Sequence, residues 1–126
     1  MSKPTVAILG ASSNPNKFGY KSLRAHLKRG YIVYPVNPKG GEIDGLRVYE
    51  RLADIPVERL DRISIYLPPA VLLKLLPEVA AKGCEEIFLN PGTESDEVIA
   101  GARALGLEPI QACSIVELGL MPDRVE

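Results

Sequence analysis

The loop over residues 10–17 is the part of the sequence whose residue types and spacing point most clearly to a chemical task. It follows Thr5–Leu9, a short apolar run rich in β-branched residues that predicts a buried strand, and a helix is expected to begin at about Lys17. The first backbone N–H groups of a helix have no partner inside it, and the helix dipole adds partial positive charge there. Strand, small-residue loop and helix N-terminus together are typical of a phosphate site, so we expect a nucleotide-like ligand held by its pyrophosphate.

Two glycines frame this loop. Gly10 suits a tight turn that a side chain would obstruct, and Gly19 is expected to let the following helix approach the sheet closely. The loop differs from the G-x-G-x-x-G fingerprint of dinucleotide-binding proteins, because it is longer and Ser12 stands in place of the second glycine. The alternative that these residues leave open is an ordinary strand-to-helix turn without a ligand.

Side chains able to catalyse a reaction are not evident. The only histidine, His26, falls in the middle of the first expected helix, and we expect it to be structural, on the surface or half-buried. Ser12 and Ser13 have no partner base in the sequence around them. Cys84 and Cys113 make neither a C-x-x-C nor a zinc-ligand spacing, so we expect no metal site. Whether the protein is an enzyme stays uncertain, and the residues favour a binding protein.

Composition narrows the class of protein. The chain has 126 residues, of which 25% are charged and 46% hydrophobic, as in ordinary globular domains. Its net charge of −1 argues against a nucleic-acid binder with a large basic face. No apolar run is long enough to cross a membrane, and the N-terminus leads straight into the first expected strand without the pattern of a signal peptide. Two cysteines fit reduced thiols, so we expect a cytoplasmic protein.

Apolar runs alternate with helical patterns along the whole chain. Strands are expected at residues 5–9, 31–36, 62–67, 86–89 and 107–111, and helices at about 17–29, 68–83, 95–105 and 114–118. Pro77 is expected to kink or restart the second helix. Strands separated by helices predict right-handed crossovers and a parallel sheet. We therefore predict an α/β fold: a single Rossmann-like domain over residues 1–126, a three-layer sandwich around a five-stranded parallel sheet of order 3-2-1-4-5, counting strands along the chain.

The loops that follow the strands are expected to meet. The carboxyl ends of parallel strands lie at one edge of a sheet, and ligands bind outside that edge where the strand order reverses. The loops gathered around one crevice would then be residues 10–17, 37–41, 66–69, 90–93 and 113–114.

The end of the second strand bears on the identity of the ligand. A chain that binds NAD needs an acid there for the ribose hydroxyls, but the first acid is Glu42, and Asn37, Pro38 and Lys39 stand in its place. A cation suits a ligand with a phosphate on its adenosine ribose, which is NADP at the 2′ position or coenzyme A at the 3′ position. Lys17 adds positive charge beside the pyrophosphate. The alternative for each lysine is a solvated surface charge.

A series of short motifs runs from the first strand to residue 56 and continues in layout through the rest of the chain. The motif positions are Gly10, Ser12, Asn14-Pro15, Lys17, Gly30-Tyr31, Pro35-Val36-Asn37-Pro38, Glu42-Ile43, Gly45, Tyr49 and Asp54-Ile55-Pro56. In these the sequence resembles the small bacterial and archaeal coenzyme A-binding domain proteins, which are similar to the CoA-binding domain of the succinyl-CoA synthetase alpha subunit. Relatives often carry Arg at the position of Lys17, and the segments 66–69 and 89–92 also depart from the usual pattern.

The resemblance implies coenzyme A as the ligand and a set of binding residues. The backbone around Gly10 would surround the pyrophosphate, the two lysines would meet phosphates, and the later loops would contact the adenosine and the pantetheine half. The candidate binding residues are Gly10, Ala11, Ser12, Asn14, Lys17, Phe18, Asn37, Pro38, Lys39, Tyr66, Pro68, Asn90 and Gly92.

Three functions follow as alternatives. The first is non-catalytic binding of coenzyme A or an acyl-CoA, the second an NAD(P)-linked protein or enzyme, and the third a regulatory or interaction subunit of a ligase-type complex. The expected partners are a small nucleotide ligand and a second copy of the chain or a ligase-type protein, with neither nucleic acid nor membrane. Cys113 is a buried small hydrophobe in one interpretation and, in another, a reactive thiol that forms a mixed disulfide with coenzyme A.

Overall fold

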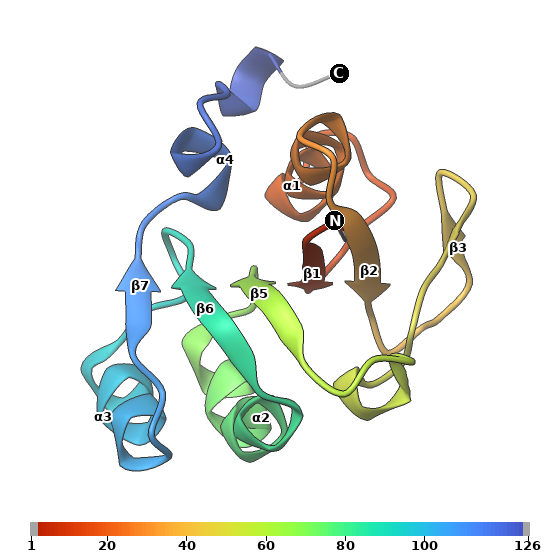
Figure 1. Ribbon diagram of the computed structural model, residues 1–126. Coiled ribbons are helices and arrows are strands. Elements are labelled where there is room, and N and C mark those ends of the chain that lie inside the picture. Colours follow the sequence, from red (N-terminus) through yellow and green to blue (C-terminus); the bar gives the residue numbers. More distant parts are fainter. Residues whose placement is uncertain (1–2, 125–126) are drawn as a thin grey trace.

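Five short strands form one parallel sheet at the centre of the molecule, in the order β2-β1-β5-β6-β7 (Figure 1). The structure is a computed structural model in which residues 3–124 are described. All four neighbouring pairs in the sheet are parallel. The strands are β1 (Thr5–Leu9), β2 (Ile32–Val36), β5 (Leu60–Ile65), β6 (Cys84–Leu89) and β7 (Pro109–Gln111).

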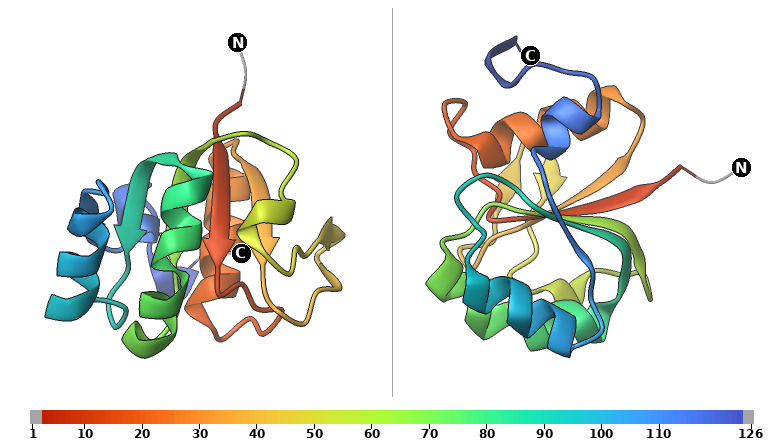
Figure 2. Two further views of the ribbon diagram at one scale, coloured as in Figure 1. Left: turned by 90° about the horizontal axis from the view of Figure 1, so that it is seen from below. Right: turned by 90° about the vertical axis from the view of Figure 1, so that its left-hand side faces the viewer.

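Helices cover both faces of the sheet. Figure 2 shows α1 (Phe18–Lys28) and the short α4 (Ser114–Glu117) on one face, with α2 (Pro69–Lys82) and α3 (Asp96–Ala104) on the other. The connection from β2 to β5 holds a small antiparallel hairpin and a 3₁₀ turn, and a second 3₁₀ turn follows α4. These elements are β3 (Glu42–Ile43), β4 (Leu46–Arg47), η1 (Leu52–Asp54) and η2 (Pro122–Arg124). The predicted fold class, a Rossmann-like α/β domain of three layers, is confirmed.

The predicted strand order is wrong. Counted along the chain, the observed order is 2-1-3-4-5 instead of 3-2-1-4-5, because β5 pairs with β1 and leaves β2 at the edge. Pro35 supplies the physical reason. It lies in β2 and has no N–H, so it is confined to an edge strand, whereas the predicted order places β2 between two neighbours. On its outer side the Pro35 carbonyl accepts a hydrogen bond from the Tyr49 N–H at 2.9 Å.

The helix α2 runs unbroken through Pro77, so the predicted restart does not occur. Pro77 removes one backbone donor, but it lies on the exposed side of α2, where water can replace that donor. The other predicted helices and strands are present, with ends that differ by up to two residues, and Ser95 caps α3 by accepting from the Val98 N–H at 3.1 Å.

Two apolar layers hold the sheet between its helices. Along β1 the side chains alternate between faces, so Val6 and Ile8 pack toward α1 while Ala7 and Leu9 pack toward α2. All four side chains are buried, so β1 contributes to both apolar layers.

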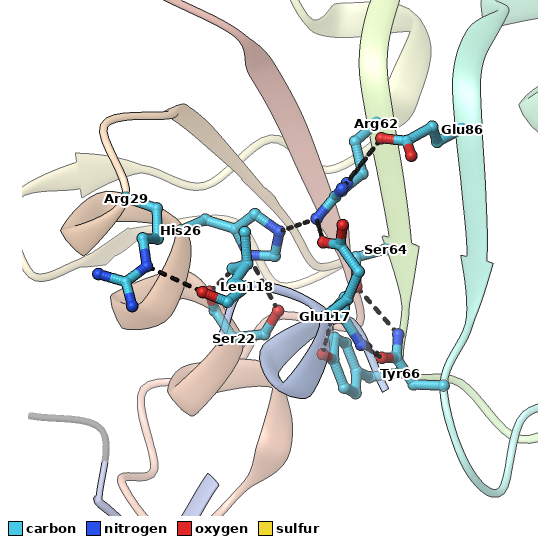
Figure 3. A network of polar contacts seen from close by, with 11 residues as sticks. Ser22, His26, Arg29, Arg62, Ser64, Tyr66, Glu86, Glu117 and Leu118 are labelled. Atoms are coloured by element: carbon cyan, nitrogen blue, oxygen red, sulfur yellow. Dashed lines mark hydrogen bonds and ion pairs between the residues drawn. The ribbon is translucent and has the colours of Figure 1, made fainter. Parts of the chain in front are cut away.

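A buried arginine interrupts the apolar layer beneath α1. The side chain of Arg62, on β5, is only 3% exposed and forms ion pairs with Glu86 at 3.0 Å and Glu117 at 2.9 Å (Figure 3). Its guanidinium also stacks on the Phe88 ring, 4.5 Å from the ring centroid. Because Glu117 belongs to α4, this cluster ties α4 to the sheet.

His26 joins the same cluster and is fully buried, so the expectation of a surface or half-buried histidine is wrong. Its Nδ1–H donates to the Ser22 carbonyl at 2.8 Å, and its Nε2 accepts from Arg62 at 3.3 Å (Figure 3). Both ring nitrogens are therefore occupied in the neutral form. Burial is the main cause that lowers the pKa of His26 to about 4, and the nearby Arg62 charge adds to the effect.

The pKa of His26 predicts how stability depends on pH. Between pH 6.5 and about 4 the unfolded chain binds a proton at His26 and the folded protein does not, so this stabilisation is complete above pH 6.5 and is lost as the pH falls. We expect the wild-type protein to lose up to about 3 kcal/mol more than His26→Gln between pH 7 and pH 4, measured by urea unfolding. Parallel pH profiles for the two proteins would contradict the assignment.

Candidate binding site at the carboxyl end of the sheet

The loops that follow the strands meet at one edge of the sheet, as predicted. From β1 the chain passes through α1 on one face, and from β5 it passes through α2 on the other face (Figure 2). The loops after these neighbouring strands therefore diverge, which is the arrangement that opens a crevice in sheets of this kind. The error in strand order does not affect this result, because parallel strands end at the same edge in either order.

The turn after β1 is shaped by backbone contacts. The N–H groups of Gly10 and Ala11 both donate to the Val36 carbonyl at 3.1 Å, which fixes the turn against β2. Gly10 has a φ of +93°, and a Cβ there would lie 2.4 Å from the Tyr66 carbonyl oxygen. Only glycine fits this conformation and this space, as the sequence predicted.

The rest of the loop is held by its own side chains. Ser12 Oγ accepts from the Asn14 N–H at 3.1 Å, and Asn14 Oδ1 accepts from the Asn16 N–H at 2.9 Å. These are local turns of the kind that Ser and Asn side chains form with the following backbone. Asn14 therefore shapes the loop, and it lines none of the hollows described below.

The N-terminus of α1 carries no cap from a side chain. Its N-cap residue, Lys17, makes no capping hydrogen bond, and the first turn contains no acid. The helix α3 differs, since Ser95 caps it and two acids occupy its first turn. A Cβ on Gly19 would lie 2.5 Å from the Gly10 carbonyl oxygen, so α1 begins in direct contact with the turn after β1. The free N–H groups of the first turn thus lie beside the loop, where an anion finds donors and a favourable dipole.

Four hollows lie side by side along this edge. The polar hollow, of about 190 Å³, includes Ala11, Ser12, Ser13, Asn37 and Lys39 in its wall. The apolar hollow, of about 250 Å³, is lined by Leu9, Gly10, Val36, Pro38, Glu50, Arg51, Leu52, Leu67, Val71, Leu75 and Glu78. The long groove, of about 350 Å³, includes Gly10, Lys17, Phe18, Gly19, Tyr66, Leu67, Pro68 and Gly92. The small hollow, of about 60 Å³, is lined by Phe18, Tyr66, Asn90, Pro91 and Cys113.

Apart from Asn14, every candidate residue lines at least one of these hollows. Both lysines and Phe18 are exposed. The side chain of Asn37 is already engaged, because its Nδ2 donates to the Ala11 carbonyl and its Oδ1 accepts from the Lys39 N–H, each at 2.9 Å. Asn37 therefore joins the ends of β1 and β2 instead of presenting its amide to a ligand.

Asn90 is the centre of a buried polar cluster. Its Nδ2 donates to Ser64 Oγ and to the Ile65 carbonyl at 2.9 Å, and its Oδ1 accepts from the Ser114 N–H at 2.8 Å. Ser114 Oγ also lies 3.0 Å from the Tyr66 hydroxyl, which positions the Tyr66 ring between the long groove and the small hollow. The sequence placed Ser114 among the loops around the crevice without giving it a role, and it gave no indication of Ser64. The alternation of polar and apolar residues along β5 is the signal that could have identified Ser64.

Two groups with a shifted pKa are protonated at neutral pH: the phenol of Tyr66, which lies in the site, and the thiol of Cys84, which begins β6 and lines none of the four hollows. Burial raises the pKa of Cys84 to about 11 and also raises the pKa of Tyr66. Cys113 is a free, half-buried cysteine in the wall of the small hollow. Within residues 3–124 no group of three potential ligands is placed to hold a metal ion.

A larger hollow adjoins the apolar hollow and shares Arg51 and Glu78 with it. It has a volume of about 720 Å³, runs along the last turns of α2 and contains none of the candidate residues. Its lysine, Lys82, already donates to the carbonyls of Ile55 and Val57 at 2.7 and 2.5 Å. We find no helix among the described residues with the length and apolar content of a membrane span.

Comparisons with known proteins agree with this geometry. The family model described as "CoA binding domain" matches residues 4–119. The alpha subunit of ADP-forming acetate–CoA ligase I from Pyrococcus furiosus is 36% identical over 89 residues, which cover 66% of this chain and 19% of that protein. The chain spans less than a fifth of the length of the curated ligases that it matches first.

Two solved structures are similar in fold. A conserved hypothetical protein from Pyrococcus furiosus is 33% identical with a TM-score of 0.80, over 92% of this chain and 99% of that one. The dinucleotide-forming acetyl-coenzyme A synthetase 1 of Ca. Korarchaeum cryptofilum, in complex with phosphate and ADP, is 27% identical with a TM-score of 0.72. The match covers 86% of this chain and 25% of the synthetase.

The contact between Gly19 and the β1 turn gives a stability prediction. Gly19→Ala places a methyl group against a backbone oxygen that cannot move aside, so we expect the free energy of unfolding to fall by about 1–3 kcal/mol. Gly101→Ala, inside α3, is the matched control, because its Cβ would meet only the flexible end of Leu76 at 3.1 Å. We expect that control to stay within about 1 kcal/mol of wild type, since helix propensity offsets mild crowding. Equal stability of both variants in urea unfolding would show that α1 does not need this close approach.

Proposed function

The chain belongs to the CoA-binding domain family, and from that premise we propose that residues 1–126 act as one domain that binds coenzyme A or an acyl-CoA without catalysing a reaction themselves. The observation that carries the proposal is the uncapped N-terminus of α1, in contact with the Gly10 turn and next to the exposed Lys17. This arrangement suits a pyrophosphate, which needs backbone donors and nearby positive charge.

The four hollows suit the successive parts of this ligand. We assign the pyrophosphate to the free N–H groups at the start of α1, beside the Gly10 turn, and the 3′-phosphate to Lys39 in the polar hollow. The adenine fits the apolar hollow beside Pro38. The pantetheine arm would follow the long groove past Phe18 toward Gly92, and its thiol end would reach the small hollow.

Binding without catalysis is supported by how the reactive side chains are used. His26 is buried beneath α1 with both ring nitrogens occupied, away from the hollows at the carboxyl edge. Tyr66 and Ser114 are hydrogen-bonded to each other, and burial keeps the Tyr66 phenol protonated. The family assignment supports coenzyme A and gives no support to NADP. The free cysteines fit the cytoplasm as the place of action.

A partner protein is the second part of the proposal. The relative from Pyrococcus furiosus is named as one subunit of a ligase, and this chain corresponds to 19% of it. We propose that the domain works beside a ligase-type partner, as a regulatory or interaction subunit, or as a homodimer. Size-exclusion chromatography of the pure protein distinguishes the homodimer, and recovery of a ligase-type protein with the tagged chain supports the other arrangement.

Calorimetric titration with coenzyme A, dephospho-CoA, NADP and NAD tests the ligand. We expect coenzyme A to bind most tightly, because both the 3′-phosphate and the pyrophosphate find cationic partners. NAD should bind least well, since the end of β2 has no acid for its ribose hydroxyls. Tight binding of NADP together with absent binding of coenzyme A would overturn the proposal.

Lys39→Ala tests the position of the 3′-phosphate. We expect this change to weaken coenzyme A by about 1–3 kcal/mol, as for a lost charge-assisted hydrogen bond, and to weaken dephospho-CoA less. Lys28→Ala, at the exposed far end of α1, is the control for a general loss of positive charge and should leave both affinities unchanged. If Lys39→Ala weakened the binding of both ligands equally, Lys39 would contact the pyrophosphate instead of the 3′-phosphate. If it changed neither affinity, Lys39 would be a solvated surface residue that contacts no ligand.

A further inference from the structure

The apolar hollow contains an acid that the protein leaves without a hydrogen bond. Most of its wall is hydrocarbon from the ends of β1 and β2 and from the first turns of α2, including Leu9, Val36, Leu67 and Val71. Glu78, two turns beyond Val71 on α2, brings a carboxylate to this wall, at the point where the apolar hollow meets the larger one. Glu50, which is exposed, and Arg51 are the other charged residues of the wall. A mainly apolar hollow with a few polar groups is how proteins commonly bind a flat heterocycle in one orientation.

The Glu78 carboxylate has no hydrogen-bond donor among the described residues. Its Oε1 is buried and unpaired, and it is the only buried side-chain oxygen or nitrogen of residues 3–124 in that condition. The nearest cation is Arg51, whose Nε lies 3.5 Å away, in an ion pair that does not meet hydrogen-bond geometry. Arg51 is 66% exposed and Glu78 only 23%, so the arginine is the member of the pair that is free to swing aside. A buried acceptor without a donor is costly, which makes a ligand that brings one favourable.

We propose that Glu78 selects adenine by accepting a hydrogen bond from its exocyclic N6 amino group. The inference rests on the proposed binding of coenzyme A and adds the residue that recognises its base. The apolar hollow adjoins the Gly10 turn on one side and Pro38, next to Lys39, on the other. A base in this hollow therefore leaves its ribose between the phosphate loop and the lysine assigned to the 3′-phosphate.

The chemistry of the carboxylate decides which base fits. A carboxylate oxygen only accepts hydrogen bonds, so it pairs with the amino group of adenine. Hypoxanthine has a carbonyl oxygen at the same position, and two acceptors facing each other leave both unpaired in a largely apolar wall. A site built around one hydrogen bond rejects the analogue that lacks it more strongly than an apolar pocket does.

Three variants and two ligands test the proposal. The ligands are coenzyme A and its hypoxanthine analogue, with dissociation constants measured by calorimetry. The variants are Glu78→Leu, which removes the acceptor, Glu78→Gln, whose amide can either accept from adenine or donate to hypoxanthine, and Glu97→Leu as a control at an exposed position of α3. Circular dichroism and urea unfolding establish that each variant is folded.

We expect wild type and Glu97→Leu to bind coenzyme A about 10- to 100-fold more tightly than the hypoxanthine analogue. Glu78→Leu should weaken coenzyme A by a similar factor and remove the preference, whereas Glu78→Gln should bind both ligands with similar affinity and keep most of the affinity for coenzyme A. Wild-type protein that binds both ligands equally, or a Glu78→Gln variant that keeps the full preference, would overturn the role of Glu78 and leave coenzyme A binding intact. Wild-type protein that binds neither ligand would overturn both proposals.

Discussion

The close contact among three backbone segments at the end of β1 is the constraint on which the site depends. Gly10 turns the chain so tightly that its α-carbon faces the Tyr66 carbonyl, and Gly19 sets the first turn of α1 against the Gly10 carbonyl. A side chain at either glycine would force apart the loop after β1, the start of α1 and the loop after β5. Because these segments touch, the unpaired N–H groups of α1 are presented beside a rigid turn. The hollows on either side exist because α1 and α2 leave this point on opposite faces of the sheet.

The polar residues around this point divide into two groups with different tasks. Asn37 and Asn90 use both the oxygen and the nitrogen of their amides inside the protein, where they join the end of β1 to β2 and the ends of β5 and β6 to α4. The second group lines the hollows and consists of charged side chains. Lys17 and Lys39 are exposed, and Glu78 Oε1 accepts no hydrogen bond within the protein. The asparagine side chains need not become ordered or lose hydrogen bonds to water when a ligand binds, because their hydrogen bonds within the protein are already made. Such a division holds the loops in place and leaves the charged groups for the ligand.

Much of the fold could be predicted because its signals are local. Apolar runs, stop residues such as Gly30 and Gly83, and the small residues after β1 each mark an element within a few positions. Strand order is a long-range property, and its prediction was wrong. Pro35 indicated that β2 lies at an edge of the sheet, because a proline inside a strand is tolerated only at an edge.

The pairing of His26 with Arg62, 36 positions away, had no local signal at all. Glu78 escaped notice for a related reason, since a single acid in an amphipathic helix is normally read as a solvated side chain.

The corrected strand order changes what the edge of the sheet can hold. In the predicted order, the loop over residues 66–69 would lie beyond β2, at the far side from the loop over residues 90–93. In the observed order the loops run in sequence from Lys39 after β2, through Gly10 after β1 and Tyr66 after β5, to Gly92 after β6 and Cys113 after β7. This is a continuous line across the sheet, with the apolar hollow near one end and the small hollow near the other.

A long ligand with a base at one end and a flexible arm at the other matches such a line better than a compact nucleotide does. The same order would deliver the reactive end of coenzyme A to the β6–β7 side, next to the short α4 that Arg62 and Ser114 fasten to the sheet.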